Sequence, residues 1–245
     1  MSKFAAIIPA RSGSKSIKDK NLALLGGYPL LAYSIAAARN TAEIGRVLVS
    51  TDSAEYAEIA RKYGAEVPFL RPKRLSLDDS TDYDFMAHII EWIDSNCSDT
   101  PEYWVHLRPT TPLREANIIT EAISLISSRK EATSLRSGHI SPESPFKWLR
   151  KNSDGFLMSL DGKDTDLDKY NGPRQDFPEV MIPNGYVDIL KSSFIREKKL
   201  LHGNRVLAFK TPFCNEVDSE EELNLIEFQL KSFGCSLINY LEGAK

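Results

Sequence analysis

The residues best suited to chemistry lie in one loop, Pro9 to Asn21, directly after a short apolar run. This loop holds four basic side chains, three serines and one glycine. It offers charged donors, hydroxyl groups and exposed backbone N–H groups together, which suits a polyphosphate. Neither the P-loop pattern GxxxxGK[ST] nor GxGxxG is present, so the loop predicts a polyphosphate site outside the Walker and dinucleotide-binding classes. A solvated loop with scattered charge is the alternative.

Two acidic stretches are candidates for binding a cation. Glu216 and Asp218 flank one residue, and alternate residues of an extended segment face the same way, so both carboxylates can point at one hard cation. The alternative is that Asp218 only favours the N-terminus of the helix that follows. The stretch from Asp164 to Asp168 contains two overlapping DxD triplets, a metal motif of many glycosyltransferases. Gly162 and Lys163 stand where a hydrophobic strand should precede such a motif, so a solvated loop is the preferred interpretation.

Alternating strands and helices must position these residues. Short apolar runs predict strands at Phe4–Ile8, Val47–Ser50, Val67–Leu70, Tyr103–Leu107, Tyr186–Leu190 and Val206–Phe209. Helices are predicted from Pro29, over Ser53–Tyr63, after caps at Ser80 and Thr81, over Glu115–Ser128, and after Ser219, with Glu222 completing a capping box. This alternation indicates an α/β fold whose mainly parallel sheet is covered on both faces. Ligands of such sheets bind beyond the carboxyl ends of the strands, where the Pro9–Asn21 loop lies.

The periodic pattern fails between Arg136 and Pro183, where glycine and proline recur. Such a stretch favours loops and short strands over another βα unit. We therefore expect a single domain over residues 1–245, with an inserted arm at about 136–183.

Composition excludes several classes of protein. The 31 basic and 34 acidic residues give a net charge of −3, so no global positive field is available to hold nucleic acid. The three cysteines have neither zinc-site nor redox spacing and are expected to be free thiols. The first apolar run is too short for a signal peptide or a membrane span, which predicts a soluble, cytoplasmic chain with no membrane partner.

Six blocks in order carry a resemblance to a known family. They are Ile8–Leu22, Val49-Ser50-Thr51-Asp52, Leu70-Arg71-Pro72, Arg108-Pro109-Thr110-Thr111-Pro112-Leu113-Arg114, Pro173-Arg174-Gln175 and Pro183-Asn184-Gly185. In these blocks the sequence resembles the acylneuraminate cytidylyltransferases, the CMP-sialic acid synthetases. The resemblance implies a three-layer, Rossmann-like nucleotidyltransferase fold. It also implies that the inserted arm is a dimerisation arm, and hence a homodimer.

The same resemblance implies roles for individual residues. The nucleotide site would comprise Arg11, Ser14, Lys15, Lys20, Asn21, Arg71, Ser80 and Asp82. Within it, Arg11 and Lys20 would hold the triphosphate as catalytic residues together with Asp218. Asn21 and Arg71 would read the cytidine, while Ser80 and Asp82 would close over the base. Magnesium would be bound by Asp218 and Glu216, although the family has aspartate where this chain has Glu216.

The acceptor end departs from the family. Lys147 and Arg174 match positions near the acceptor, and either residue could serve the partner's site. Arg108 stands where sialic acid synthetases commonly have glutamine, and Ile182 where they tend to have arginine. The resemblance thus implies transfer of CMP from CTP to a sialic-acid-like 2-keto-3-deoxy acid sugar. Alternatives are 3-deoxy-manno-octulosonate or another acid sugar as acceptor, a DxD glycosyltransferase, and a non-catalytic nucleotide sensor.

Overall fold

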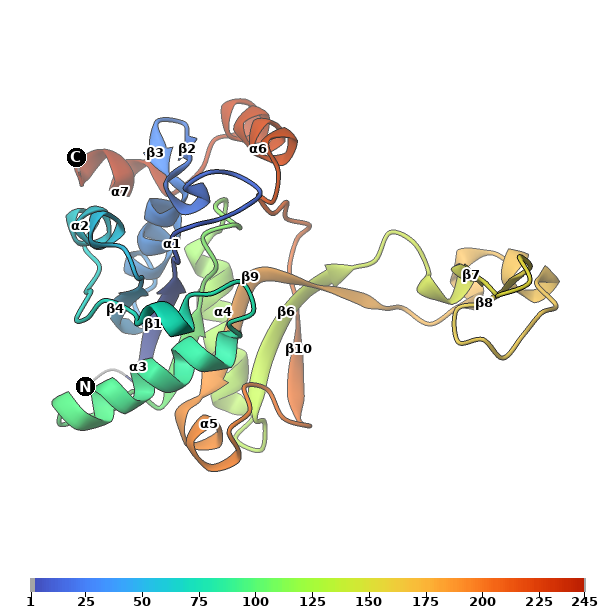
Figure 1. Cartoon of the computed structure of the whole chain (residues 1–245), viewed down its shortest axis with the longest axis horizontal. Helices are drawn as coiled ribbons and strands as arrows, with labels where there is room; N and C mark the ends of the chain where they lie inside the picture. Colours follow the sequence, from blue (N-terminus) through green and yellow to red (C-terminus); the bar gives the residue numbers. More distant parts are fainter. Residues whose placement is uncertain (1–2, 245) are drawn as a thin grey trace.

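Six strands form one central sheet in the computed structural model, which describes residues 3–244 (Figure 1). Their order is β10-β6-β9-β5-β1-β4. Pairs β1–β4, β1–β5 and β6–β10 are parallel, and β9 is antiparallel to both of its neighbours. The strands are β1 (Phe4–Pro9), β4 (Ile44–Ser50), β5 (Tyr103–His106), β6 (Ser134–Ile140), β9 (Met181–Lys191) and β10 (Val206–Lys210). The prediction of a mainly parallel α/β sheet is confirmed.

Helices cover both faces of this sheet, which makes three layers (Figure 1). The alternation of side chains along β1 sends Phe4, Ala6 and Ile8 to one core and Ala5 and Ile7 to the other. The first core is packed by α1 (Leu30–Arg39), α2 (Ala54–Lys62), α4 (Ala116–Ser128), α6 (Glu220–Phe233) and α7 (Ile238–Gly243). The second is packed by α3 (Asp82–Asn96) and α5 (Ser192–Lys198). None of the helices in residues 3–244 is both long and apolar enough to cross a bilayer.

Local capping signals predicted several helix boundaries correctly. Thr81 and Asp84 form a capping box at the start of α3, and Ser219 and Glu222 form another at α6. Gly64 follows α2 with a φ of +88°, in the left-handed region that glycine tolerates. Cys97, Cys214 and Cys235 are free thiols, as expected.

The strand predicted at Val67–Leu70 is wrong. Glu66 makes an isolated bridge to Leu48, and the chain then leaves the sheet without continuing a ladder. It turns through the short helix η2 (Lys73–Leu75) toward α3. An apolar run of four residues was too short to distinguish a strand from a segment that packs beside one.

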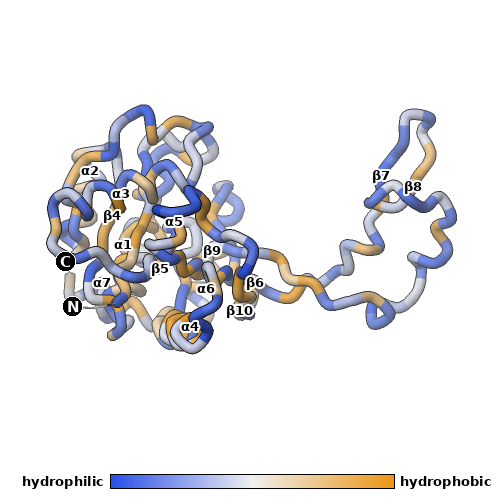
Figure 2. The backbone as a smooth tube through the Cα atoms, turned by 90° about the horizontal axis from the view of Figure 1, so that it is seen from below, coloured by the Kyte–Doolittle hydropathy of each residue, from blue (hydrophilic) through white to orange (hydrophobic). Residues whose placement is uncertain are grey.

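The arm begins later and ends earlier than its sequence suggested. Strand β6 extends to Ile140 and β9 starts at Met181, so residues placed in the arm belong to a long antiparallel pair. Beyond it the chain runs out to a hairpin of β7 (Leu149–Lys151) and β8 (Leu157–Ser159), with the short helices η3 (Pro145–Lys147), η4 (Asp168–Asn171) and η5 (Arg174–Asp176). Figures 1 and 2 show this arm projecting from the body.

Candidate active site

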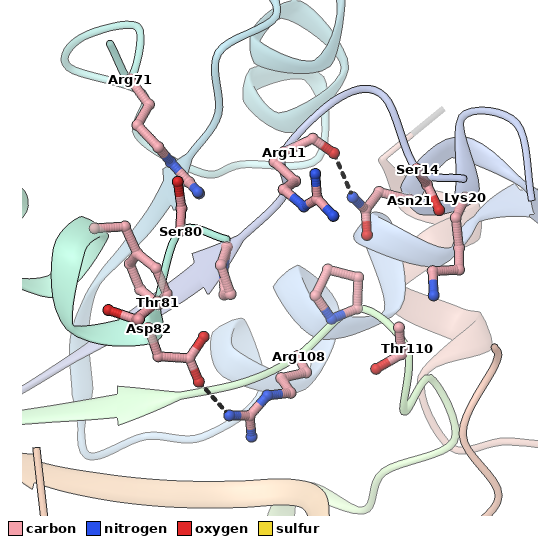
Figure 3. Close-up of a pocket in the computed structure, with 13 residues that line it drawn as sticks. Arg11, Ser14, Lys20, Asn21, Arg71, Ser80, Thr81, Asp82, Arg108 and Thr110 are labelled. Atoms are coloured by element: carbon pink, nitrogen blue, oxygen red, sulfur yellow. Dashed lines mark hydrogen bonds and ion pairs between the residues drawn. The ribbon is translucent and has the colours of Figure 1, made fainter. Parts of the chain in front are cut away.

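A pocket of about 220 Å³ opens where β1 and β5 end. Residues from four stretches of the chain line it: Pro9, Arg11, Ser14, Lys20, Asn21, Arg71, Ser80, Thr81, Asp82, Phe85, Arg108, Pro109 and Thr110 (Figure 3). Seven of the eight residues predicted for the nucleotide are therefore neighbours, since only Lys15 is missing from this lining. Their assembly follows from the strand order, because β1 lies beside β5 and both strands end at the same edge.

The loop after β1 is held in one conformation by neighbouring side chains. The backbone N–H and hydroxyl of Ser12 both donate to Asp52, at 2.7 and 2.8 Å. The amide of Asn21 donates to the Arg11 carbonyl at 2.9 Å, and the Tyr56 hydroxyl donates to Asp19 at 3.0 Å. Asp19 takes a left-handed φ of +50°, which it tolerates better than most residues. The basic side chains therefore project from a fixed backbone.

Carboxylates from other loops partner the cations of this loop. Asp78 accepts from Lys15 and, at 2.9 Å, from Arg11. Hydrogen bonds from Lys15 and then Arg11 hold the pKa of Asp78 below its usual range. Lys20 Nζ lies 2.8 Å from Asp218 Oδ1, and its side chain is only 15% exposed. An anion entering the pocket thus meets cations that are already paired.

Arg71 is held in place by Ser50 at the end of β4. Its guanidinium donates to the Ser50 hydroxyl at 3.0 Å and to the Ser50 carbonyl at 2.5 Å. The guanidinium also lies 5.1 Å from the centre of the Phe85 ring. Burial lowers the pKa of Arg71 to about 10, so it remains a cation at neutral pH.

Arg108, at the end of β5, lies between two carboxylates. It donates to Asp82 at the start of α3 and, at 3.3 Å, to Asp188 on β9. Asp188 is buried, and burial raises its pKa although Arg108 opposes the shift. Figure 3 shows the Asp82–Arg108 contact across the pocket from Lys20 and Ser14. The pocket thus has a basic side chain, paired with carboxylates, at each end.

A buried arginine fixes the loop that carries Arg108. Arg114 donates to the carbonyls of Arg108, Gly185 and Tyr186 and to the Ser34 hydroxyl, at 2.5 to 2.9 Å. It therefore joins the loop after β5 to β9 and α1. Arg114 was recognisable in the sequence only as part of a motif, because its partners are backbone carbonyls and one hydroxyl group, most of them from distant segments.

Of the two predicted metal ligands, Asp218 lies at the Lys20 end and Glu216 contacts Gly185. Glu216 Oε1 accepts from the Gly185 N–H at 2.8 Å, and Asp218 is 67% exposed beside Lys20. Residues 3–244 contain no cluster of three or more His, Cys, Asp or Glu able to hold a metal. Two carboxylates nevertheless fit Mg²⁺, which usually takes one or two from protein together with substrate phosphates. The donor chemistry is therefore suitable for a metal that arrives with a nucleotide.

Lys147 and Arg174 do not reach this pocket. Lys147 donates to the Gly172 carbonyl at 2.8 Å, and Arg174 to the carbonyls of Ser141 and Pro142 at 2.7 and 2.8 Å. All these contacts lie in the arm. The DxD stretch is there too, and Asp164 pairs with Lys169 and Tyr170. Lys147 and Arg174 were predicted to lie near the acceptor, in this site or in the partner's, and the arm carries both away from the pocket of their own chain (Figure 1).

Some lining residues were not predicted as site residues. Phe85 was assigned only to the apolar face of its helix, yet its ring lies at the pocket beside Arg71. Pro9, Thr81, Pro109 and Thr110 complete the walls. Pro9, Pro109 and Thr110 lie in the blocks that carry the family resemblance, and Thr81 is next to Ser80 in the sequence.

Known proteins match this chain in both sequence and fold. Residues 5–154 match the family described as cytidylyltransferase. An N-acylneuraminate cytidylyltransferase of Escherichia coli O18:K1:H7 is 33% identical over 91% of this chain and 50% of that relative. A pseudaminic acid cytidylyltransferase of Campylobacter jejuni is 39% identical over 49% of this chain and 51% of its own length. The chain spans about half the length of the first curated relatives that it matches.

A solved structure gives the same result for the fold. The CMP:2-keto-3-deoxy-manno-octonic acid synthetase complexed with CTP superposes with a TM-score of 0.68. The match covers 94% of this chain and 99% of that structure, at 14% identity. At that identity the likeness concerns the fold alone.

Proposed function

The chain belongs to the cytidylyltransferase family, and we propose that it transfers CMP from CTP to the anomeric hydroxyl of a 2-keto-3-deoxy acid sugar. The products are a CMP-sugar and pyrophosphate. Relatives named for N-acylneuraminate, pseudaminic acid and legionaminic acid support a nonulosonate as the acceptor. The octulosonate remains the alternative acceptor.

One observation carries the proposal: a single pocket holds separate cationic groups for two anions. Arg11 and Lys20 lie at the loop after β1, and Arg108 lies near α3 at the end of β5. A nucleoside triphosphate needs the first pair, and the carboxylate of an acid sugar needs the third cation. The rest of the molecule, with a net charge of −3, offers no general attraction for either.

The reaction follows from this arrangement of charges. The sugar hydroxyl loses its proton and attacks the α-phosphorus of CTP in line with the bond to the leaving pyrophosphate, so that a CMP-sugar, pyrophosphate and a proton are formed. Arg11 and Lys20 stabilise the negative charge that grows on pyrophosphate as that bond breaks. Ser14 and the backbone of the same loop supply further donors. Holding both substrates in one pocket makes the attack effectively intramolecular.

Magnesium is the proposed cofactor. Asp218, with Glu216, would hold it, and the bound ion would neutralise phosphate oxygens during transfer. Lys20 already pairs with Asp218, so the residues that bind the phosphates and the metal form one charged group. This arrangement supports binding of the nucleotide and its metal at one place.

We further propose a cytoplasmic homodimer. Three free thiols suit a reducing compartment. The arm exposes large apolar side chains, among them Trp148, Phe156 and Leu157. A second copy of the chain is the partner that would cover them.

The test is a magnesium-dependent pyrophosphate-release assay with CTP. N-acetylneuraminate, legionaminate, pseudaminate and 3-deoxy-manno-octulosonate are offered as acceptors. Release with at least one of them, and not without an acceptor, is the expected result. Binding of CTP with no release from any acceptor contradicts the proposal and favours a nucleotide sensor. Release with another nucleotide in place of CTP contradicts the choice of base.

A further inference from the structure

The two carboxylates that hold Arg108 differ in their access to water. Asp188 is 1% exposed, whereas Asp82 is 39% exposed. The same guanidinium bonds both, and it faces the pocket with its own side chain 27% exposed. Arg108 therefore has one internal partner and one partner at the pocket surface.

Asp188 is fixed by the sheet. It lies in β9, directly across from His106 on β5 and Arg136 on β6. Within the part of the chain that the structure describes, its Oδ1 atom is buried without a hydrogen-bond partner. Loss of Arg108 would leave this carboxylate buried and unpaired, which is strongly unfavourable.

Asp82 is under no such constraint. It is the first residue of α3, but Thr81 and Asp84 make the capping box of that helix. The Asp82 carboxylate can therefore leave Arg108 without uncapping α3. A partly exposed ion pair of this kind contributes little to stability, so water can replace Arg108 at small cost.

The charges around Arg108 favour exchange of one carboxylate for another over addition of a third. Arg108 and Arg136 face Asp82 and Asp188, so two cations offset two carboxylates there, and Arg71 also lies within electrostatic reach of Asp82. His106 and His202 lie beside them, and burial lowers the pKa of both, so each is neutral at pH 7. A third carboxylate in this partly buried place would be repelled by Asp82 and Asp188, and departure of Asp82 reduces that repulsion.

Resting on the function proposed above, we propose that Asp82 is an exchangeable counter-ion of Arg108. The carboxylate of the acid sugar replaces the Asp82 carboxylate on the guanidinium, while Asp188 keeps the guanidinium in place. Arg108 thereby reads the acidic group of the acceptor, and Asp188 is a positioning residue. A neutral sugar brings Arg108 no charge in place of the Asp82 carboxylate, so the pair favours acidic acceptors.

The experiment compares an acid sugar with its methyl ester. The acceptor with the fastest pyrophosphate release is used, and KM and kcat are measured for acid, ester and CTP. The wild type is expected to prefer the acid by roughly 10- to 100-fold in kcat/KM, as for a charge-assisted hydrogen bond. Arg108→Gln abolishes this preference, and Arg108→Lys retains part of it. Asp188→Asn raises KM for the acid more than KM for CTP.

Asp82→Asn is expected to lower the KM for the acid instead of raising it. A residue with a merely structural role would not give this result. Removing the competing carboxylate lowers KM for the acid by about threefold, as expected for loss of a partly exposed ion pair. KM for the ester changes little. The control is Asp79→Asn, an exposed aspartate on the same segment, which should alter neither KM.

Acid preference that survives Arg108→Gln, or a raised acid KM in Asp82→Asn, overturns this inference while the proposed function stands. If no acceptor releases pyrophosphate, the proposed function fails, and binding then decides the inference. Melting temperature is measured with each acid and its ester in the presence of CTP. The inference is supported if the acid raises the melting temperature of the wild type more than the ester does, and if this difference is absent in Arg108→Gln. Equal increases with acid and ester in the wild type overturn it. If Arg108→Gln does not melt cooperatively, Arg108→Lys and Asp82→Asn are read instead.

Discussion

Most of the basic side chains at the pocket are paired with a carboxylate from another part of the chain. Arg11 and Lys15 share Asp78, Lys20 pairs with Asp218, and Arg108 pairs with Asp82. Most of these groups are partly exposed, so each pair adds little to stability and can be exchanged for a substrate anion. The pairs keep the free pocket close to neutral while its cations stay in position.

Lys20 gives the clearest test of the phosphate end. Lys20→Ala is expected to lower kcat by about 10²- to 10³-fold, because one donor to developing negative charge is lost. Pyrophosphate release at saturating substrate measures the effect. Lys18→Ala is the matched control, since Lys18 is exposed, lies in the same loop and is not among the pocket residues. Equal losses in the two variants would show that the loop contributes only general positive charge.

His106 ties stability to pH. Burial holds its pKa well below the usual 6.5, so protonation favours the unfolded chain. Its contribution to stability is complete above about pH 6.5 and falls as the pH drops toward the folded-state pKa. Uptake of this one proton by the unfolded chain lowers the free energy of unfolding by about 2 kcal/mol between pH 7 and pH 5.

His106→Phe keeps a ring against Phe85 and removes the titration. Urea unfolding at pH 7 and pH 5 should therefore show a smaller difference in the variant than in the wild type. Burial also lowers the pKa of His88 and His202, so the variant keeps part of the dependence. The same pH difference in both proteins would contradict the assignment to His106.

Among the helices and strands, those whose position depends on neighbouring residues were predicted correctly from the sequence. The capping box of Ser219 and Glu222 placed α6, and apolar runs placed β1, β4 and β5. The failures lie where long-range pairing decides. Strand β6 contains Gly138 and enters the stretch that looked irregular, and its partner is β9, more than forty residues away. The sequence of β6 and its neighbours does not predict its pairing with β9.

The candidate site was predictable to a similar extent. The loop after β1 carried its own signal in basic residues and serines, and most of its predicted nucleotide contacts meet in one pocket. The pairing of Arg108 with Asp82 and Asp188 was not foreseen, because it joins β5, α3 and β9 across the sequence. Arg174 was placed at the acceptor by similarity alone, and its position depends on the path of the arm.

The cap of α6 also organises the approach to Asp218. Glu222 Oε2 accepts from the N–H groups of Asp218 and Ser219, each at 2.8 Å. Glu222→Ala should lower the free energy of unfolding by about 1 kcal/mol, as expected for loss of a helix cap. Urea denaturation measures this. Glu221→Ala removes the same charge from the same turn without touching the cap, so a matching loss there would contradict the capping role.

The whole molecule consists of an α/β body, which contains the pocket, and an arm, which contains Lys147 and Arg174 (Figure 1). If these two cations act on the acceptor, they must do so in the pocket of another copy, because the arm leads away from its own body. Figure 2 shows apolar segments along the arm among hydrophilic ones. Both features are consistent with the proposed homodimer.

The arm therefore gives a test of assembly. Phe156 is 72% exposed near the tip, and Phe156→Asp with Leu157→Asp should convert a dimer into a monomer, because charges would be buried without partners at the interface. Sedimentation velocity measures the mass, and circular dichroism checks that the body stays folded. Phe233→Asp is the control, since Phe233 is 84% exposed at the end of α6 on the body, and its variant should remain dimeric. A wild-type monomer at micromolar concentration, or a double variant that still dimerises, would rule out the arm as the interface.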